Sequence, residues 1–141
     1  MDSPRVGVGA TVLREGRILL GRRRGSHGAG EYSSPGGHLD HLESFKACAR
    51  RETREECGLE IANVRFHFVA NVATYAPRHY VHLGLLADWA AGDPRVLEPD
   101  RCEGWGWYTI DAPPHPLFEM TRLALAAFRA GTAYFDLPGE P

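Results

Sequence analysis

Three glutamates lie close together near the end of one predicted helix, in the stretch GGHLDHLESFKACARRETREECGL over residues 36–59. Glu52 and Glu56 stand four residues apart, a spacing at which like charges repel even on an exposed helix. The apolar stripe of the helix consists of Phe45, Cys48 and Ala49. At about 100° per residue the stripe continues onto Glu52 and Glu56, with Glu55 beside it, so we expect all three acids to face inward. Buried carboxylates without compensation are costly, and the site therefore needs a positive charge.

A divalent cation would supply that charge better than the basic residues of the same helix. Arg51 can meet Glu55 at i+4, whereas the other basic side chains of the helix point to the solvent side. All ligands on offer are oxygens, which select a hard ion such as Mg²⁺ or Mn²⁺ over Zn²⁺. The glycines at 36 and 37 allow main-chain carbonyls to approach such an ion. The alternative is a solvated acidic helix end, and the inward direction of the acids argues against it.

Composition indicates an ordinary globular protein. The chain has 141 residues, of which 43% are hydrophobic and 24% charged, and its formal net charge is −2. We expect one domain over residues 1–141, with a core from about 5 to 131. All but one of the 16 basic residues are arginines, which suit bidentate capture of carboxylate or phosphate. The net charge gives no sign of general binding to polyanions.

Cysteine usage and hydropathy bear on the compartment. The three cysteines form no CxxC pair, which favours free buried thiols in a reducing environment. No apolar run is long enough to cross a membrane, and the first residues do not have the pattern of a signal peptide. We therefore expect a cytoplasmic protein without a membrane partner.

Periodicity and turn residues predict a mixed arrangement of strands and two helices around the acidic segment. Strands are predicted over residues 5–13, 17–22, 64–75, 80–89 and 105–110. Helices are predicted over 43–57 and 117–130, the first with a capping box of Asp40 and Glu43 and a C-cap at Gly58. Residues 26–34 are expected to form a loop closed by a turn at 35–37, and the tail over 132–141 to be irregular.

The acidic segment resembles the Nudix box, G-x5-E-x7-R-E-U-x-E-E-x-G-U, where U is a bulky aliphatic residue. The matching positions are Gly37, Glu43, Arg51, Glu52, Glu55, Glu56, Gly58 and Leu59. Thr53 departs from the pattern, and we expect it to weaken apolar packing under the helix slightly. Similarity extends from about Val6 to Gly131 and includes VGVGATVL, ILLGRRRG and EPDRCEGWGWY. The chain looks most similar to MutT-like nucleoside triphosphate diphosphatases, in the branch with the human thiopurine-nucleotide and oxidised-purine diphosphatase.

The resemblance implies both a fold and an activity. The implied fold is an α/β (α+β) sandwich of α/β/α type, with a mixed β-sheet, a catalytic loop-helix-loop and a C-terminal helix. The implied enzyme is a Nudix pyrophosphohydrolase. It would use Mg²⁺, or Mn²⁺, to hydrolyse a nucleoside triphosphate, modified or oxidised ones included, to the monophosphate and pyrophosphate. The expected partner is a nucleotide rather than a nucleic acid, and the resemblance suggests a homodimer.

Roles for individual residues also come from the resemblance. Glu52 and Glu56 correspond to metal ligands, Glu55 to a ligand or the water-activating base, and Gly37 to a carbonyl donor. Arg51 would orient the carboxylates as part of the catalytic set, together with Glu55 and Glu56, while Glu43 would support the loop. Glu103 matches an extra metal-binding carboxylate, and the choice of base between Glu55 and Glu103 stays open. The implied substrate-binding residues are Arg23, Gly36, His38, Met120 and Thr121.

Departures from the branch pattern keep several alternatives open. Glu119-Met120-Thr121 and Ser34 replace more apolar residues of the branch, so pyrimidine triphosphates remain candidates beside purines. A Nudix hydrolase of ADP-ribose or of a dinucleotide is a second hypothesis. A nucleotide-sensing or RNA-binding module without hydrolysis is a third, against which the retained acids argue. Ordinary surface or core positions are expected for His41, His67, His79, His82 and His115.

Overall fold

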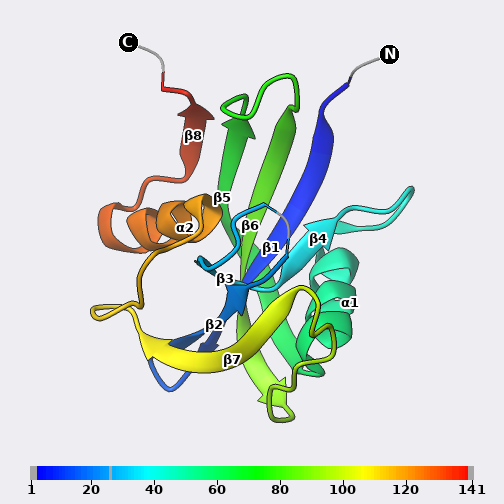
Figure 1. Cartoon of the computed structure of the whole chain (residues 1–141), viewed down its shortest axis with the longest axis vertical. Helices are drawn as coiled ribbons and strands as arrows, with labels where there is room; N and C mark the ends of the chain where they lie inside the picture. The colour runs from blue at the N-terminus through cyan, green and yellow to red at the C-terminus, as the bar shows by residue number, and fades with distance from the viewer. Residues whose placement is uncertain (1–2, 26, 140–141) are drawn as a thin grey trace.

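The computed structural model describes residues 3–25 and 27–139 and is built around one mixed sheet (Figure 1). The strands are β1 (Arg5–Arg14), β2 (Arg17–Arg23), β3 (Tyr32–Ser33), β4 (Gly36–His38), β5 (Glu60–Val72), β6 (Tyr80–Ala91), β7 (Cys102–Thr109) and β8 (Tyr134–Leu137). The helices are α1 (Phe45–Cys57) and α2 (Glu119–Ala130). They lie on opposite sides of the sheet, so the predicted sandwich of strands and helices is confirmed (Figure 1).

Strand order explains how distant segments meet at one place. Over the described residues the main path of the sheet is β3-β2-β1-β6-β5-β8, while β4 pairs with β1 and β7 with β2. The β1–β6 and β5–β8 pairs are parallel and the other pairs are antiparallel. β1 therefore lies between the glycine strand β4 and the long strand β6, with α1 packed against β1, β4 and β5.

Three segments that were predicted to be a loop, a turn or irregular contain short strands. The tail includes β8, whose residues pair in parallel with β5 from Val69 to Val72. The predicted turn at 35–37 runs into β4, which pairs with β1 through Gly9 and Gly36. Short strands of this kind are stabilised by the free backbone groups of a neighbouring strand, which local sequence does not reveal. The two-residue strand β3 likewise lies inside the predicted loop at 26–34.

The ends of α1 agree only in part with the predicted signals. Ser44 is the N-cap, and its hydroxyl accepts the Ala47 N–H at 3.1 Å. The Glu43 carboxylate accepts the Asp40 N–H at 3.1 Å, but the Glu43 N–H donates to the Asp40 backbone carbonyl, so the pair closes the turn before the helix instead of capping it. Gly58 is the left-handed C-cap as predicted, with φ 74°. The second helix also starts later than predicted, at Glu119.

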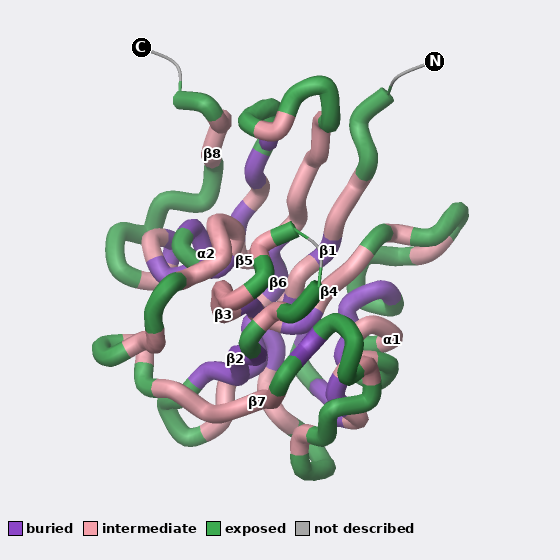
Figure 2. The backbone as a smooth tube through the Cα atoms, viewed as in Figure 1, coloured by how far each residue is buried: buried purple, intermediate pink, exposed green. Residues whose placement is uncertain are grey.

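The core lies between the sheet and the inner faces of the helices (Figure 2). On α1 the buried residues are Cys48, Ala49, Thr53 and Cys57. Phe45 was expected in this stripe, but it is 47% exposed at the start of the helix. The Thr53 hydroxyl donates to the Ala49 carbonyl at 2.7 Å, which satisfies its buried oxygen. All three cysteines are free and buried, in agreement with the expectation from their number and spacing.

Neither helix within the described ranges has both the length and the apolar character that a membrane span requires.

Candidate active site

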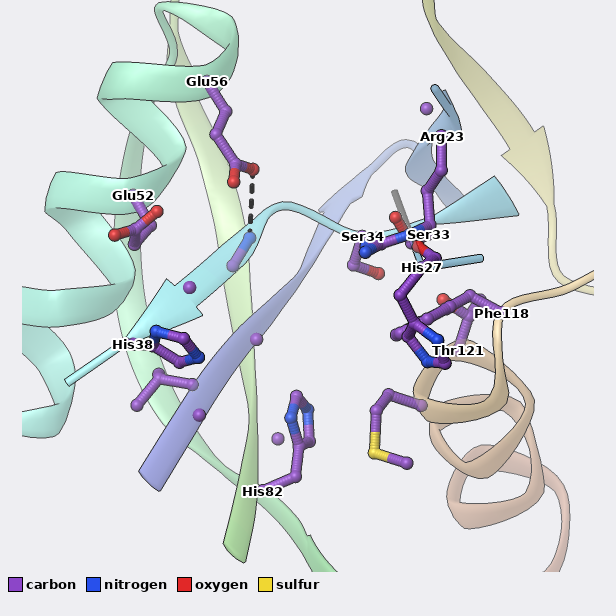
Figure 3. Close-up of a pocket in the computed structure, with 18 of the residues that line it drawn as sticks. Arg23, His27, Ser33, Ser34, His38, Glu52, Glu56, His82, Phe118 and Thr121 are labelled. Carbon is purple, nitrogen blue, oxygen red and sulfur yellow. Dashed lines mark hydrogen bonds between the residues drawn. The ribbon is translucent and has the colours of Figure 1, made fainter. Parts of the chain in front are cut away.

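A cavity of about 620 Å³ brings most of the predicted site residues together. Its lining includes Arg23, His38, Glu52, Glu56, Met120 and Thr121. The glutamates come from α1 on one side, and Arg23 and the start of α2 stand on the other (Figure 3). The floor is formed by β1 and β6 (Figure 3). A volume of this size suits a small-molecule ligand.

Only two of the three helix acids face the cavity. Glu52 and Glu56 belong to its lining, and the side chain of Glu52 is 15% exposed. Glu55 lies outside the lining and its side chain is 52% exposed, so the predicted inward direction is wrong for this residue. Successive residues of a helix diverge by about 100°, which turns Glu55 toward solvent when Glu56 points inward.

Arg51 holds the loop before α1 and one cavity acid in a single ion-pair cluster. Its guanidinium bonds Glu43 at 2.7 Å, Glu52 at 2.7 Å and Glu55 at 3.3 Å. Arg51 also donates to the His38 carbonyl at 3.1 Å. The hydrogen bond from Arg51 lowers the pKa of Glu43 to about 2. Arg51 therefore contacts more carboxylates than the single i+4 partner predicted from helix spacing, and it orients Glu52.

Glu56 lacks such compensation. Its carboxylate accepts the Gly36 N–H at 3.1 Å, the hydrogen bond drawn in Figure 3. Among the ion pairs of the described chain none involves Glu56. Burial raises its pKa to about 8, and burial also raises the pKa of Glu52. Removing a carboxylate from water disfavours its charged form, so Glu56 favours either a proton or a cation that enters the cavity.

The two glycines of β4 allow the acids to lie against the strand. A Cβ atom on Gly37 would overlap the Glu52 carboxylate, and one on Gly36 would stand 2.5 Å from the Val8 carbonyl oxygen. Any larger residue would push Glu52 away from the strand or separate β4 from β1. The glycine pair thus allows close approach of Glu52 and of β1, whereas the predicted approach of its carbonyls to a cation stays a prediction.

A further carboxylate of the cavity, beside Glu52, Glu56 and Asp40, is Glu98, which the sequence analysis missed. Glu98 lines the cavity from the segment between β6 and β7, and its charge adds to the effect of burial on Glu52 and Glu56. Its carbonyl accepts the Arg101 and Cys102 N–H groups at the entrance to β7. The sequence indicates only a turn at the EPD stretch before β7, and a turn does not show which way the Glu98 side chain points.

Glu103, the predicted extra carboxylate, lies elsewhere. It forms ion pairs with Arg22 at 3.2 Å and Arg24 at 3.5 Å and is not part of the lining. Neighbouring residues of a strand point to opposite faces, so Glu103 faces away from the side on which Cys102 meets the cavity. The geometry therefore gives its predicted metal role no support.

The oxygen donors fit a hard dication that keeps part of its water shell. Within the described residues no cluster of three or more His, Cys, Asp or Glu side chains could hold a metal ion by itself. Glu52 and Glu56 offer two carboxylates beside the Gly36–Gly37 backbone. Mg²⁺ commonly binds through one or two carboxylates, several waters and substrate phosphates, so this incomplete donor set suits it.

The opposite end of the cavity is aromatic and apolar, and Arg23 stands beside it. The Arg23 guanidinium lies 4.1 Å from the Phe118 ring centroid, and its Nε donates to the His27 carbonyl at 3.1 Å. Burial lowers the pKa of Arg23, while the charge of Glu56 opposes that change. His38 stacks on Tyr80 at the edge near the acids. Carboxylates at one end, an arginine across from them and an apolar end beyond define a site suited to a nucleotide polyphosphate with a dication.

Comparison with known proteins assigns the family. Residues 3–128 match the NUDIX domain model, and the chain therefore belongs to the Nudix family. A MutT NUDIX hydrolase from Burkholderia pseudomallei is 41% identical, with a TM-score of 0.83, and the match covers 88% of this chain and 97% of that one. The predicted family, fold and enzyme class are thereby confirmed.

Sequence relatives carry two different names. The NAD-capped RNA hydrolase NudC of Chromobacterium violaceum is 35% identical over 112 residues, which are 79% of this chain and 41% of NudC. The oxidized purine nucleoside triphosphate hydrolase of Danio rerio is 32% identical, over 73% of this chain and 65% of that protein. The chain spans about half or less of the NudC relatives. Their name conflicts with the expectation that nucleic acid is no partner, and the diphosphatase branch stays a prediction.

Proposed function

We propose that this chain hydrolyses a nucleoside triphosphate to the monophosphate and pyrophosphate, with Mg²⁺ or Mn²⁺ as cofactor. The observation that carries the proposal is Glu56, a largely buried carboxylate without an ion-pair partner in the described chain, across the cavity from Arg23. An acid in this position is stabilised either by a proton or by a cation that enters with the ligand. A polyphosphate then balances both the cation and the arginine.

Glu52 and Glu56 would hold the cation, with the Gly37 carbonyl and Glu98 as further donors. When bound, the cation would lower the pKa of a water and stabilise the charge on the phosphates. Arg51 keeps Glu52 in place through its 2.7 Å ion pair, and the N–H of Gly36 does the same for Glu56. Because these contacts already hold the carboxylates in place, the side chains lose less conformational freedom when the substrate binds.

Arg23 would bind the phosphate chain, because a guanidinium forms charge-assisted and often bidentate hydrogen bonds with phosphate oxygens. A carboxylate of the cavity would accept the proton of the attacking water, since a general base must be within hydrogen-bond reach of it. Glu98 meets this condition better than the two acids predicted from the resemblance. Glu55 is exposed and Glu103 is paired with arginines away from the cavity.

The nucleobase would occupy the apolar end near Met120 and Thr121. Thr121 is 3% exposed and Met120 packs against the Phe68 cluster, so both belong to a rigid wall. The acids of the motif are all retained, which favours an enzyme over a binding module.

A second candidate substrate is a dinucleotide with an internal pyrophosphate. The relatives named NudC favour it, because NAD contains such a linkage and these relatives match most of this chain. The same acids and arginine would act on either substrate. The three free, buried cysteines support the proposed cytoplasmic location for both.

The test is a substrate panel with purified protein and millimolar Mg²⁺, in which products are separated by chromatography. The panel contains the canonical, oxidised and methylated nucleoside triphosphates, ADP-ribose and NADH. Release of monophosphate and pyrophosphate from a triphosphate, absent with EDTA, is the expected result. Faster cleavage of NADH would favour the dinucleotide, and no cleavage of any compound would contradict the proposal.

A further inference from the structure

His82 on β6 points from the floor of the cavity toward its centre, between the acids of α1 and the start of α2 (Figure 3). Its ring lies over the glycines of β1. A Cβ on Gly9 would stand 3.0 Å from Nε2, and one on Gly7 would stand 3.4 Å from Nδ1. The bare backbone of β1 therefore leaves the space in which the imidazole sits.

The position of His82 connects it to the apolar end of the cavity. Its ring stacks on Phe68, with centroids 5.7 Å apart and planes 29° from parallel. Phe68 is 1% exposed and belongs to the buried cluster against which Met120 packs. Packing on both sides fixes the imidazole plane, so its nitrogens have a defined direction. Such a fixed polar group in an apolar wall is typical of ligand recognition.

No described residue forms a hydrogen bond with either ring nitrogen of His82. His79 shows the contrast, because its Nε2 lies 2.6 Å from the Asn71 side-chain oxygen. Burial lowers the pKa of His82 to about 4, so the ring is neutral near pH 7 and offers one donor and one acceptor. The Ser34 hydroxyl, also in the lining, is buried without a partner. Polar atoms left unpaired in a site are costly until a ligand satisfies them.

An ordinary core histidine is the competing explanation, and His67 illustrates it. Both of its ring nitrogens are buried and unpaired, and its ring packs 4.6 Å from Phe128. Burial lowers the pKa of His67 to about 4 as well. His67 is absent from the cavity lining, however, whereas His82 belongs to it. Both residues lie on strands, carry neutral rings near pH 7 and pack against Phe68. They differ in that only His82 lines the cavity.

We infer that His82 is a specificity-determining residue that forms a hydrogen bond with the edge of the nucleobase, at the apolar end of the cavity. This inference rests on the proposed nucleotide substrate. A phosphate is the wrong partner for a neutral ring on the Phe68 wall, because Arg23 and the cation site serve the phosphates. A base stacked at this end would present donors and acceptors to the imidazole and to the Ser34 hydroxyl.

The experiment compares His82→Phe, which keeps a flat ring, with His82→Gln, which keeps a donor and an acceptor. His67→Phe is the matched control. The four common ribonucleoside triphosphates and their 2′-deoxy forms are assayed for kcat and KM. For the preferred base we expect His82→Phe to lower kcat/KM by about 5- to 150-fold, chiefly through KM, which is the effect of one unsatisfied hydrogen bond. The difference between bases should shrink, His82→Gln should restore part of it, and His67→Phe should preserve the wild-type ratios.

A binding arm separates failure of this inference from failure of the proposed reaction. Calorimetric titration of the four nucleoside monophosphates measures base preference without turnover. If the wild type cleaves no triphosphate, the proposed function fails, and a base preference lost only in His82→Phe would still support recognition by His82. The inference is overturned if the wild type shows no base preference, or if His82→Phe keeps it. If His82→Phe changes only the ratio of kcat/KM between ribo- and deoxyribonucleotides, His82 contacts the sugar, and the inference of base recognition is overturned.

Discussion

Replacement of Glu56 by glutamine should make the metal-free protein more stable while it abolishes activity. The amide has nearly the shape of the carboxylate, and its oxygen can still accept the Gly36 N–H that now lies 3.1 Å from Glu56. What the substitution removes is a negative charge held in a largely buried position without an ion-pair partner among the described residues. Activity and stability should therefore change in opposite directions.

The magnitude follows from the pKa of Glu56, about 8 in the folded chain against an ordinary value of 4.5. Because the folded state binds this proton more tightly, its contribution to stability is fully present below pH 4.5 and is lost as the pH rises through 8. At pH 7.5 the loss amounts to about 2–4 kcal/mol, and at pH 5 to less than about 1 kcal/mol. Glutamine carries no such penalty, so the melting temperature at pH 7.5 should rise by on the order of 10 °C.

The assay is thermal unfolding in EDTA from pH 5 to pH 8.5, with urea unfolding at the two ends of the range. Glu55→Gln is the control, because Glu55 stands on the same helix but is 52% exposed; we expect its stability to follow that of the wild type. Triphosphate hydrolysis by Glu56→Gln in Mg²⁺ should fall by at least a hundredfold. The reasoning is refuted if the stability gain of Glu56→Gln does not grow with pH, or if turnover stays near normal.

Three further predictions concern the cation, Glu98 and the contribution of His67 to stability in acid. Mg²⁺ at millimolar concentration should raise the melting temperature of the wild type, and more at pH 8.5 than at pH 6, because a proton on Glu56 competes with the ion; equal shifts at both values would contradict a role for Glu56 as ligand. Glu98→Gln should lower kcat at least tenfold and Glu103→Gln should change it less than twofold, because of these two residues only Glu98 lines the cavity. If steady-state kinetics show the opposite ranking, Glu103 is the extra carboxylate, as the resemblance implied. Burial lowers the pKa of His67 to about 4, so the unfolded chain takes up this proton first and the contribution of His67 to stability should fall by about 1–3 kcal/mol between pH 6.5 and pH 4; the difference in unfolding free energy between the wild type and His67→Phe, measured in urea at the two pH values, should change by this amount.

Local features of the chain could be predicted because they depend on residues near one another in sequence. The spacing of Glu52 and Glu56 places both on one side of α1, and both line the cavity. The left-handed cap at Gly58 and the close approach at Gly37 follow from the absence of a Cβ atom. The preference for a hard dication, which stays a prediction, likewise rests on the oxygen donors that this one segment offers.

Tertiary structure decided which polar groups share the cavity. Whether Glu98 or Glu103 joins the helix acids depends on how the segment before β7 crosses the sheet, and neither periodicity nor spacing records that path. The predicted inward direction of Glu55 failed for a related reason, since an apolar stripe estimated from Phe45 was slightly misplaced around the helix axis.

His82 and β8 show the same division. An isolated histidine in an apolar strand is usually an ordinary core residue, and only the glycines of β1, brought alongside by parallel pairing, leave room for the ring to face the cavity. The tail becomes strand β8 because β5 offers it an unpaired edge. Sequence alone thus determined the chemistry of the acidic helix, whose residues interact through neighbouring turns. Pairing between distant strands determined what that chemistry faces, because backbone hydrogen bonds form between segments whose order no local pattern specifies.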